Sequence, residues 1–240
     1  MQTIILCGGE GTRLMPKTQY RPKPMVDVGG KPLLWHIMKI YSHQGYNDFI
    51  LATGYKGDFI KRYFSKNNKD GFHIRIVDTG QKSLTGERVR RLRKYIKGEN
   101  FMLTYGDGVA DVDIKSLLKL HEEKKVMATM TGVHPRHRFG LVTLGDNNLV
   151  ASFYQKPILS DTVNGGFMAM SKKVFDYVKK DSMIEDIFMP LAQEKQLALY
   201  PHSGFWFAID TYRDLLDANQ LWQEKPLWKK IALALLGLFL

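Results

Sequence analysis

The chain has 240 residues, 44% hydrophobic and 12% aromatic, which excludes a disordered chain and indicates an ordered globular protein with a sizeable core. Thirty-five Lys and Arg residues oppose 24 Asp and Glu, and the formal net charge of +11 indicates an anionic partner. Nucleic acid, an acidic membrane surface and a polyphosphate substrate all fit that charge, and composition alone does not choose among them.

The first part of the chain alternates strand and helix patterns. An apolar strand over residues 3–6 precedes helical spacing over 33–41 and a strand over 49–52, which together form a βαβ unit. The alternation of strands and helices continues with a helix over 58–64, strands over 72–77 and 101–105, a helix over 114–121 and a strand over 126–133. Such alternation favours a largely parallel sheet with helices on both faces.

After about residue 135 the pattern changes to closely spaced strands. These lie over 139–144, 149–155 and 163–170, with polar turns between them, so we expect the sheet to be mixed here. Helices near 172–180, 184–194 and 211–222 complete the pattern. Since no low-complexity linker interrupts the chain, we expect one compact domain over residues 1–228.

The remaining residues, 229–240, form an apolar tail. Lys229 and Lys230 precede ten apolar residues, which fall short of the roughly 20 that span a bilayer, so no transmembrane segment is expected. A helix packed on the core or on another subunit is our preferred interpretation. Contact with a membrane surface is the alternative, because Trp222 and Trp228 stand close to the paired lysines.

The N-terminus and the cysteine content indicate a cytoplasmic protein. Gly8 and Gly9 interrupt the first apolar run too early for an export signal. Cys7 is the only cysteine, so an intramolecular disulfide is excluded and a buried thiol is expected.

A glycine-rich loop, Gly8-Gly9-Glu10-Gly11-Thr12-Arg13-Leu14, follows the first strand. Its glycines allow backbone amides to approach a phosphate, and Arg13 supplies a positive fork. Open α/β sheets bind ligands where such a strand ends. The spacing matches neither the dinucleotide-binding fingerprint nor a Walker A loop. A turn without a ligand is the alternative.

The loop and the segment Pro22-Lys23-Pro24 together resemble the signature of the sugar-1-phosphate nucleotidyltransferases. Four further stretches, 30–38, 54–57, 77–80 and 103–109, are similar to the branch that takes CTP and glucose 1-phosphate. The resemblance implies a single Rossmann-like three-layer α/β/α domain with a mixed, mostly parallel sheet. It also implies Mg²⁺, an NTP and a sugar 1-phosphate as ligands, a homo-oligomer, and formation of an NDP-sugar and pyrophosphate.

By this resemblance Arg13, Lys23, Asp107 and Asp210 are catalytic, and both aspartates bind metal. The nucleotide site comprises Leu6, Gly8, Gly9, Gly11, Thr12, Arg13, Lys23, Thr85, Gly86, Tyr105, Gly106 and Asp107. The sugar-phosphate site comprises Gly108, Gln155, Lys156, Asn164, Gly165 and Gly166. Mg²⁺ prefers carboxylate and phosphate oxygens, and a strand end holds such ligands rigidly. The alternatives are a simple turn for Asp107 and a helix N-cap for Asp210, since one aspartate serves only one such role well.

The chain departs from the family pattern at three places. Gln155 stands where a glutamate is usual, and its amide can donate as well as accept hydrogen bonds, which bears on the sugar recognised. Glu87 replaces a glycine near the base, and the segment after Phe64 is shorter. Thymidylyl, uridylyl or guanylyl transfer is therefore the alternative to cytidylyl transfer. The basic residues of the next helix are interpreted as a solvated helix face, and the alternatives are that they screen a triphosphate or reach a neighbouring subunit. They are Arg88, Arg90, Arg91, Arg93, Lys94 and Lys97.

A regulatory nucleotide-binding or nucleic-acid-binding module is the competing interpretation from another class. The basic residues are spread along the chain without an RNA-binding signature, and both metal-type aspartates are present. We therefore expect an enzyme and no nucleic-acid partner.

Overall fold

The computed structural model describes residues 1–224 and 227–229. Its centre is a seven-stranded sheet with the order β12-β8-β11-β6-β1-β4-β5. Neighbouring strands are parallel except where β11 pairs with β6 and with β8. The strands are β1 (Gln2–Leu6), β4 (Asp48–Thr53), β5 (His73–Asp78), β6 (Asn100–Tyr105), β8 (Ala128–Val133), β11 (Val163–Ser171) and β12 (Leu197–Pro201). The expectation of a mixed, mostly parallel sheet is confirmed.

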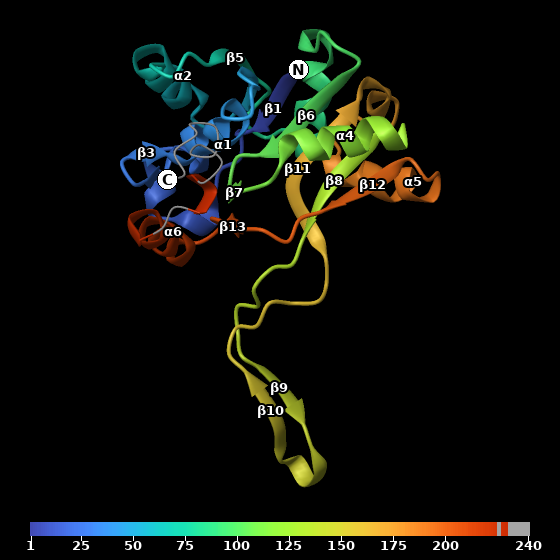
Figure 1. Ribbon diagram of the computed structural model, residues 1–240. Helices are drawn as coiled ribbons and strands as arrows, with labels where there is room; N and C mark the ends of the chain where they lie inside the picture. The colour runs from blue at the N-terminus through green and yellow to red at the C-terminus, as the bar shows by residue number, and fades with distance from the viewer. Residues whose placement is uncertain (225–226, 230–240) are drawn as a thin grey trace, which may run out of the picture.

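Helices cover both faces of this sheet, which confirms the three-layer α/β/α arrangement (Figure 1). Side chains alternate along a strand, so Ile5 joins one buried cluster and Ile4 the other. The first cluster packs under α1 (Leu33–Ser42), α2 (Gly57–Asn67), α4 (Ile114–Lys124) and α6 (Tyr212–Glu224). The second packs under α3 (Thr85–Leu92) and α5 (Phe188–Gln193).

Most elements expected from the pattern have a counterpart within a few residues, but two helices differ. The helix expected over 172–180 is a 3₁₀ turn, Lys172–Asp176. The one expected over 184–194 begins as a 3₁₀ turn, Ile184–Ile187, and becomes α5 only at Phe188. The amide of Met183 donates to Asp186 Oδ2, 2.8 Å away, which fixes the start of that turn.

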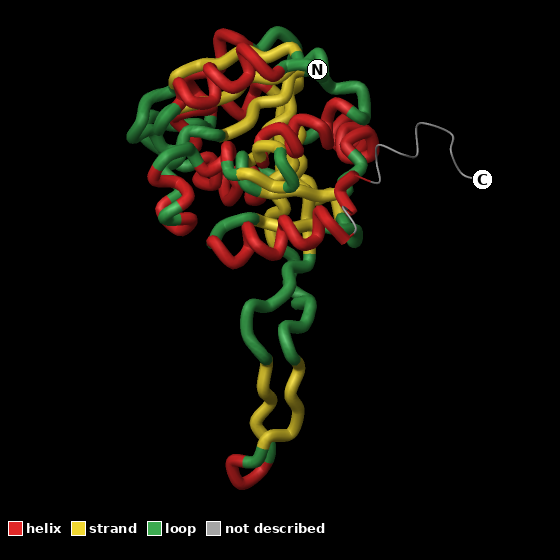
Figure 2. Tube along the Cα trace, turned by 90° about the vertical axis from the view of Figure 1, so that its left-hand side faces the viewer, coloured by secondary structure: helices red, strands yellow, loops and turns green. Residues whose placement is uncertain are grey.

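The strands expected over 139–155 form a separate hairpin outside the central sheet. Among the strands of residues 1–224, β9 (Leu141–Leu144) pairs only with β10 (Val150–Tyr154), in antiparallel register. Figures 1 and 2 show this hairpin standing well away from the body of the protein. The mixed character of the central sheet therefore comes from β11 alone.

The order of the strands places a ligand site at the carboxyl ends of β1 and β6. From β1 the chain builds outward through β4 and β5, then returns to add β6 on the opposite side of β1. In open α/β sheets, such a reversal opens a crevice at the carboxyl ends of the two strands. The segments that follow Leu6 at the end of β1 and Tyr105 at the end of β6 therefore meet at this crevice.

No helix in the described ranges is long and apolar enough to cross a membrane. Residues 225–226 and 230–240 lie outside the described ranges, and so do most of the residues of the expected apolar tail. Between these two ranges, Trp228 is buried and stacks on Phe205, with ring centroids 5.5 Å apart.

Candidate functional site

The glycine-rich loop leaves β1 at Leu6 and turns sharply. Gly11 has a left-handed backbone with φ of +64°, and a Cβ there would lie 2.6 Å from Lys23 Cβ, so a side chain fits neither the conformation nor the space. The 3₁₀ turn Thr12–Leu14 follows, and Leu14 is buried beneath it. Arg13 remains exposed on that turn and reaches Asp210 Oδ1 at 3.0 Å.

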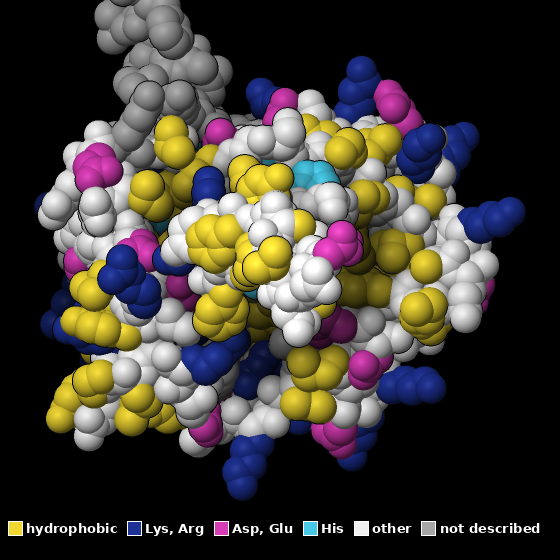
Figure 3. Space-filling view, turned by 90° about the horizontal axis from the view of Figure 1, so that it is seen from below, with side chains coloured by type: hydrophobic (Ala, Val, Ile, Leu, Met, Phe, Trp, Pro, Cys, Tyr) yellow, Lys and Arg dark blue, Asp and Glu magenta, His cyan; other side chains and the backbone are white. Residues whose placement is uncertain are grey.

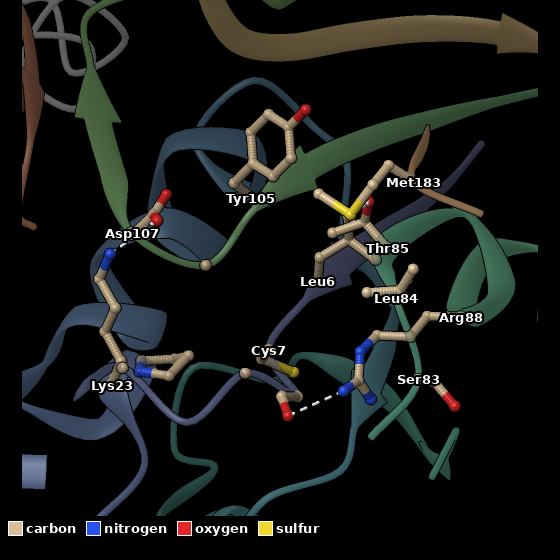
Figure 4. Close-up of a pocket in the computed structure, with 15 residues that line it drawn as sticks. Leu6, Cys7, Lys23, Ser83, Leu84, Thr85, Arg88, Tyr105, Asp107 and Met183 are labelled. Atoms are coloured by element: carbon tan, nitrogen blue, oxygen red, sulfur yellow. Dashed lines mark hydrogen bonds and ion pairs between the residues drawn. The ribbon is translucent and has the colours of Figure 1, made fainter. Parts of the chain in front are cut away.

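A buried guanidinium, that of Arg88 on α3, supports the start of this loop. It is 4% exposed and donates to the carbonyl of Gly8 at 3.0 Å (Figure 4). A Cβ on Gly8 would come within 2.2 Å of Arg88 Nη1, so only glycine fits there. The other acceptors of the Arg88 guanidinium are Thr53 O, Thr79 Oγ1, Gly80 O and Gln81 O, at 2.8–3.2 Å. The interpretation of the basic segment as a solvated helix face is therefore wrong for Arg88.

Replacing Arg88 is expected to destabilise the protein. Arg88→Ala removes five hydrogen bonds, three of them to buried acceptors, and we expect the free energy of unfolding to fall by roughly 3 kcal/mol. Urea denaturation followed by circular dichroism measures the change. Arg93→Ala, which removes an exposed arginine close by, is the control and should cost far less. Equal losses in the two variants would contradict this role of Arg88.

The two predicted metal ligands converge because a short second ladder joins their segments. β7 (Gly108–Ala110) pairs antiparallel with β13 (Trp206–Ala208). One step beyond, the amide of Ile209 donates to the carbonyl of Asp107 at 2.8 Å. Lys23 Nζ then lies 2.8 Å from Asp107 Oδ2 and 2.7 Å from Asp210 Oδ1. We call Asp107 and Asp210 the carboxylate pair.

Asp210 is not the N-cap of α6. Thr211 Oγ1 accepts a hydrogen bond from the amide of Asp214, and Asp214 Oδ2 accepts one from the amide of Thr211, at 3.2 and 2.8 Å. This reciprocal capping box leaves the carboxylate of Asp210 available for other contacts. Partial burial raises the pKa of Asp210, but the hydrogen bond from Lys23 and nearby positive charges outweigh it and lower the pKa below its usual value.

Two cavities adjoin at the carboxylate pair. The first, of about 270 Å³, lies between the glycine-rich loop and the start of α3, and Figure 4 shows its lining. The second, of about 280 Å³, lies on the other side of Asp107, toward β11 and β13. Tyr105 and Asp107 line both, and Asp210 lines the second. A molecule in each cavity would therefore meet the other beside Asp107.

Most residues predicted to bind nucleotide line the first cavity. These are Leu6, Gly8, Gly9, Gly11, Lys23, Thr85, Tyr105, Gly106 and Asp107. Arg13 lines the second cavity, whereas Thr12 and Gly86 line neither. Cys7 also borders the first cavity, and burial raises its pKa to about 12, so the thiol stays protonated at neutral pH.

The residues predicted to bind the sugar phosphate separate into two groups. Gly108, Asn164, Gly165 and Gly166 line the second cavity. Gln155 and Lys156 are exposed, directly after β10, and line neither cavity. The structure therefore brings four of these six residues to the carboxylate pair.

Some lining residues were not found from the sequence. Ser83, Leu84 and Met183 line the first cavity, and Phe167 and Trp206 line the second. Glu185 accepts hydrogen bonds from Thr85 Oγ1, at 3.1 Å, and from the hydroxyl of Tyr105. It thus ties together two walls of the first cavity. Residues 183–185 carry no local signal, because they reach the site only through contacts with segments 80 to 100 residues away in the sequence.

Glu87, one of the departures from the family pattern, binds α3 to the segment that carries Met183. Its fully buried carboxylate accepts from Arg90 Nε and Arg91 Nε, each at 2.7 Å, and from the amide of Asp181 at 3.4 Å. Hydrogen bonds from Arg90 lower the pKa of Glu87 to about 2, burial opposes this, and Arg91 adds to the lowering.

This lowered pKa makes the contribution of Glu87 dependent on pH. A depressed carboxyl pKa stabilises the fold above the unfolded value of 4.5, and the effect is lost as the pH falls toward 2. We expect Glu87→Gln to reduce the free energy of unfolding at pH 7, with a smaller difference from wild type at pH 3. Urea titrations at both pH values test this. A difference that does not change with pH would contradict it.

The carboxylate pair is a suitable but incomplete donor set for a hard divalent cation. Within residues 1–224 and 227–229, no cluster of three or more His, Cys, Asp or Glu side chains could hold a metal ion. Two aspartates would leave the other positions of an octahedral ion to phosphate oxygens and water, as is usual for Mg²⁺ at phosphate-transfer sites. The donor set therefore fits Mg²⁺ brought in with a polyphosphate.

Comparison with known proteins agrees with this geometry. A family model described as nucleotidyl transferase matches residues 2–225. A Bacillus subtilis protein named probable glucose-1-phosphate cytidylyltransferase is 42% identical, and the match covers 95% of this chain and 99% of that protein. The glucose-1-phosphate cytidylyltransferase of Salmonella typhimurium is 41% identical, with the same coverage. The crystal structure of HddC from Yersinia pseudotuberculosis superposes with a TM-score of 0.73 at 26% identity, covering 92% of this chain and 99% of that one.

Proposed function

Because the chain belongs to the nucleotidyl transferase family, we propose that it transfers CMP from CTP to glucose 1-phosphate, and that residues 1–228 form the catalytic domain. The names of its 41–42% identical relatives support this pair of substrates. The observation that carries the proposal is the carboxylate pair, which stands where two cavities meet beside a glycine-rich loop.

The proposed reaction needs no protein nucleophile. A phosphate oxygen of the sugar 1-phosphate forms a bond to the α-phosphorus of the nucleotide. The bond from that phosphorus to the bridging oxygen breaks, and pyrophosphate leaves with the electron pair. We assign the nucleotide to the first cavity and the acceptor to the second, so that Asp107 lies between them. Catalysis is then positioning and charge neutralisation.

The chain supplies positive charge where the two cavities meet. Lys23 and Arg13 stand at the junction of the cavities and would offset the repulsion between two highly anionic substrates. The glycine-rich loop, held by Arg88, would present backbone amides to the nucleotide phosphates. On the resemblance alone, Gln155 and Lys156 are proposed as further contacts of the acceptor.

Divalent metal use is typical of this family, and we propose Mg²⁺ for this chain, held by Asp107 and Asp210. When bound, the ion would neutralise phosphate charge and polarise the α-phosphorus. Lys23 contacts both carboxylates, so its ammonium group must give up part of this contact when a cation binds between them.

A pyrophosphate-release assay with each of the four NTPs and several sugar phosphates tests the substrates. We expect kcat/KM for CTP and glucose 1-phosphate to exceed that of every other pair by at least about tenfold, a difference of 1.4 kcal/mol in transition-state binding. A preference for another NTP or acceptor would overturn the assignment of substrates but not the chemistry. Absence of turnover with all pairs, together with tight salt-dependent RNA binding, would overturn the enzyme assignment.

A further inference from the structure

Glu185 is a carboxylate beside a site that is otherwise suited to anions. The hairpin of β9 and β10 leaves the sheet after β8, at the same edge at which the parallel strands β1 and β6 end. Figure 3 views this edge from below, along the hairpin, and shows Lys and Arg side chains around it. Glu185 is exposed, and none of the ion pairs within residues 1–224 and 227–229 includes it. An unpaired negative charge repels phosphates, so a favourable role for Glu185 depends on its hydrogen bonds.

The carboxylate of Glu185 joins Thr85 to Tyr105. One oxygen, Oε2, accepts from Thr85 Oγ1 at 3.1 Å, and the other, Oε1, accepts from the hydroxyl of Tyr105. The amide of Ile184 donates to Thr85 Oγ1 at 2.8 Å, so the threonine is held from two directions. Hydrogen bonds to an ionised carboxylate are roughly twice as strong as those between neutral groups. The bridge therefore fixes the spacing between the first residue of α3 and the last residue of β6.

Tyr105 forms part of the wall between the two cavities. It lines both of them, whereas Thr85 lines the first and not the second. A Cβ on Gly166 would lie 2.8 Å from Tyr105 Cδ2, so one edge of the ring lies directly against this glycine of the second cavity. Figure 4 shows Tyr105 at the end of β6, and Thr85 together with Met183 at another part of the wall of the first cavity. A shift of Thr85 therefore reaches the second cavity through Glu185 and the ring of Tyr105.

We propose that Glu185 is a positioning residue that couples the two cavities, so that a nucleotide in the first strengthens binding of the acceptor in the second. A nucleotide that contacts Thr85 and Tyr105 holds this chain of hydrogen bonds in place, and the acceptor then meets a ring that is already positioned. Coupling between two sites commonly changes affinity by about 5–150-fold. The proposal rests on the function proposed above, because it assigns the nucleotide and the acceptor to these cavities.

The charge of Glu185 and its bridge predict opposite effects for Glu185→Ala. If charge alone mattered, removing a carboxylate close to two anionic ligands should tighten the binding of both. If the bridge matters, the variant should bind the acceptor more weakly whenever the nucleotide is present. Glu185→Gln also removes the charge, but its amide can still accept from Tyr105 and donate to Thr85. This variant should therefore keep most of the coupling.

Calorimetric titration of the full chain measures the coupling without turnover. Glucose 1-phosphate is titrated into the protein and Mg²⁺, without and with saturating α,β-methylene CTP, which cannot release pyrophosphate. We expect the analogue to lower the Kd of glucose 1-phosphate by about tenfold or more in the wild type, and by less than about twofold in Glu185→Ala and in Tyr105→Phe. Glu194→Ala is the matched control and should keep the wild-type coupling. The carboxylate of Glu194 accepts from the hydroxyl of Tyr177, and Glu194 lines neither cavity.

A double variant and the sign of the effect complete the test. Glu185→Ala/Tyr105→Phe should match either single variant, because both substitutions break the same bond. Wild-type coupling in Glu185→Ala, or tighter binding of the acceptor by that variant with nucleotide bound, would overturn the proposal. So would a wild type that binds both ligands without coupling. If the wild type binds neither ligand, the proposed substrates fail, and the same titration with the pair that the pyrophosphate-release assay selects then tests Glu185.

Discussion

Asp210→Asn is expected to lower kcat by roughly 10²–10³-fold while the protein stays folded. The substitution removes a charge that Lys23 contacts at 2.7 Å and Arg13 at 3.0 Å, and with it one of the two carboxylates proposed to hold the cation. The fold should persist, because Thr211 and Asp214 cap α6 without the Asp210 side chain. Steady-state pyrophosphate release, together with circular dichroism, measures both effects.

The matched control is Asp217→Ala, on α6. Asp217 pairs with the exposed Arg213 at 3.0 Å and lines neither cavity, so we expect little change in stability or activity. The two variants should thus separate the general effect of a lost negative charge from catalysis. If Asp217→Ala lost as much activity as Asp210→Asn, the carboxylate pair would not be the reason for the loss.

Lys23→Ala is expected to lower kcat/KM by roughly 10²-fold or more. Lys23 lies between two prolines and its side chain is only 12% exposed. Its ammonium group contacts Asp210 and also Asp107, and Figure 4 shows the contact with Asp107 at the edge of the first cavity. Without it, the phosphates lose a fixed positive charge. Pyrophosphate-release kinetics measure the loss.

The same variant should show the opposite effect on metal affinity. Lys23 competes with a cation for Asp107 and Asp210, so its removal leaves two carboxylates close together without a neutralising group. We therefore expect Lys23→Ala to bind Mg²⁺ more tightly than the wild type in calorimetric titration, although it turns over more slowly. Lys17→Ala, which removes an exposed lysine six residues earlier, is the control and should change neither property. Weaker Mg²⁺ binding by Lys23→Ala would contradict this account of the lysine.

The central α/β fold could be predicted from the sequence because its elements are long and periodic. The apolar run over 3–6 and the helical spacing over 33–41 correspond to β1 and α1 almost residue for residue. The glycine-rich loop and Lys23 were identified for a related reason, since local chemistry and the stiffening prolines mark them without any tertiary contact.

The approach of Asp210 to Asp107 could be inferred only through the family resemblance. It depends on β7 and β13, two three-residue strands almost 100 residues apart, and strands so short carry no periodic signal. The burial of Arg88 was also beyond sequence reasoning. A helix rich in arginine indicates a solvated face, and only the surrounding carbonyls show that one guanidinium points inward.

The hairpin of β9 and β10 was predicted only in part. Its alternating residues predicted strands over 139–144 and 149–155, and strands are present. A strand pattern does not specify its pairing partner, however, so the separation of β9 and β10 from the central sheet could not be foreseen.

Binding of Mn²⁺, a spectroscopic substitute for Mg²⁺, tests the central claim most directly. Electron paramagnetic resonance titrations in the presence of an unreactive CTP analogue should be compared among the wild type, Asp107→Asn and Asp210→Asn. If both aspartates hold the ion, each variant should bind Mn²⁺ at least about tenfold more weakly than the wild type. Wild-type affinity in either variant would show that the carboxylate pair does not form the metal site.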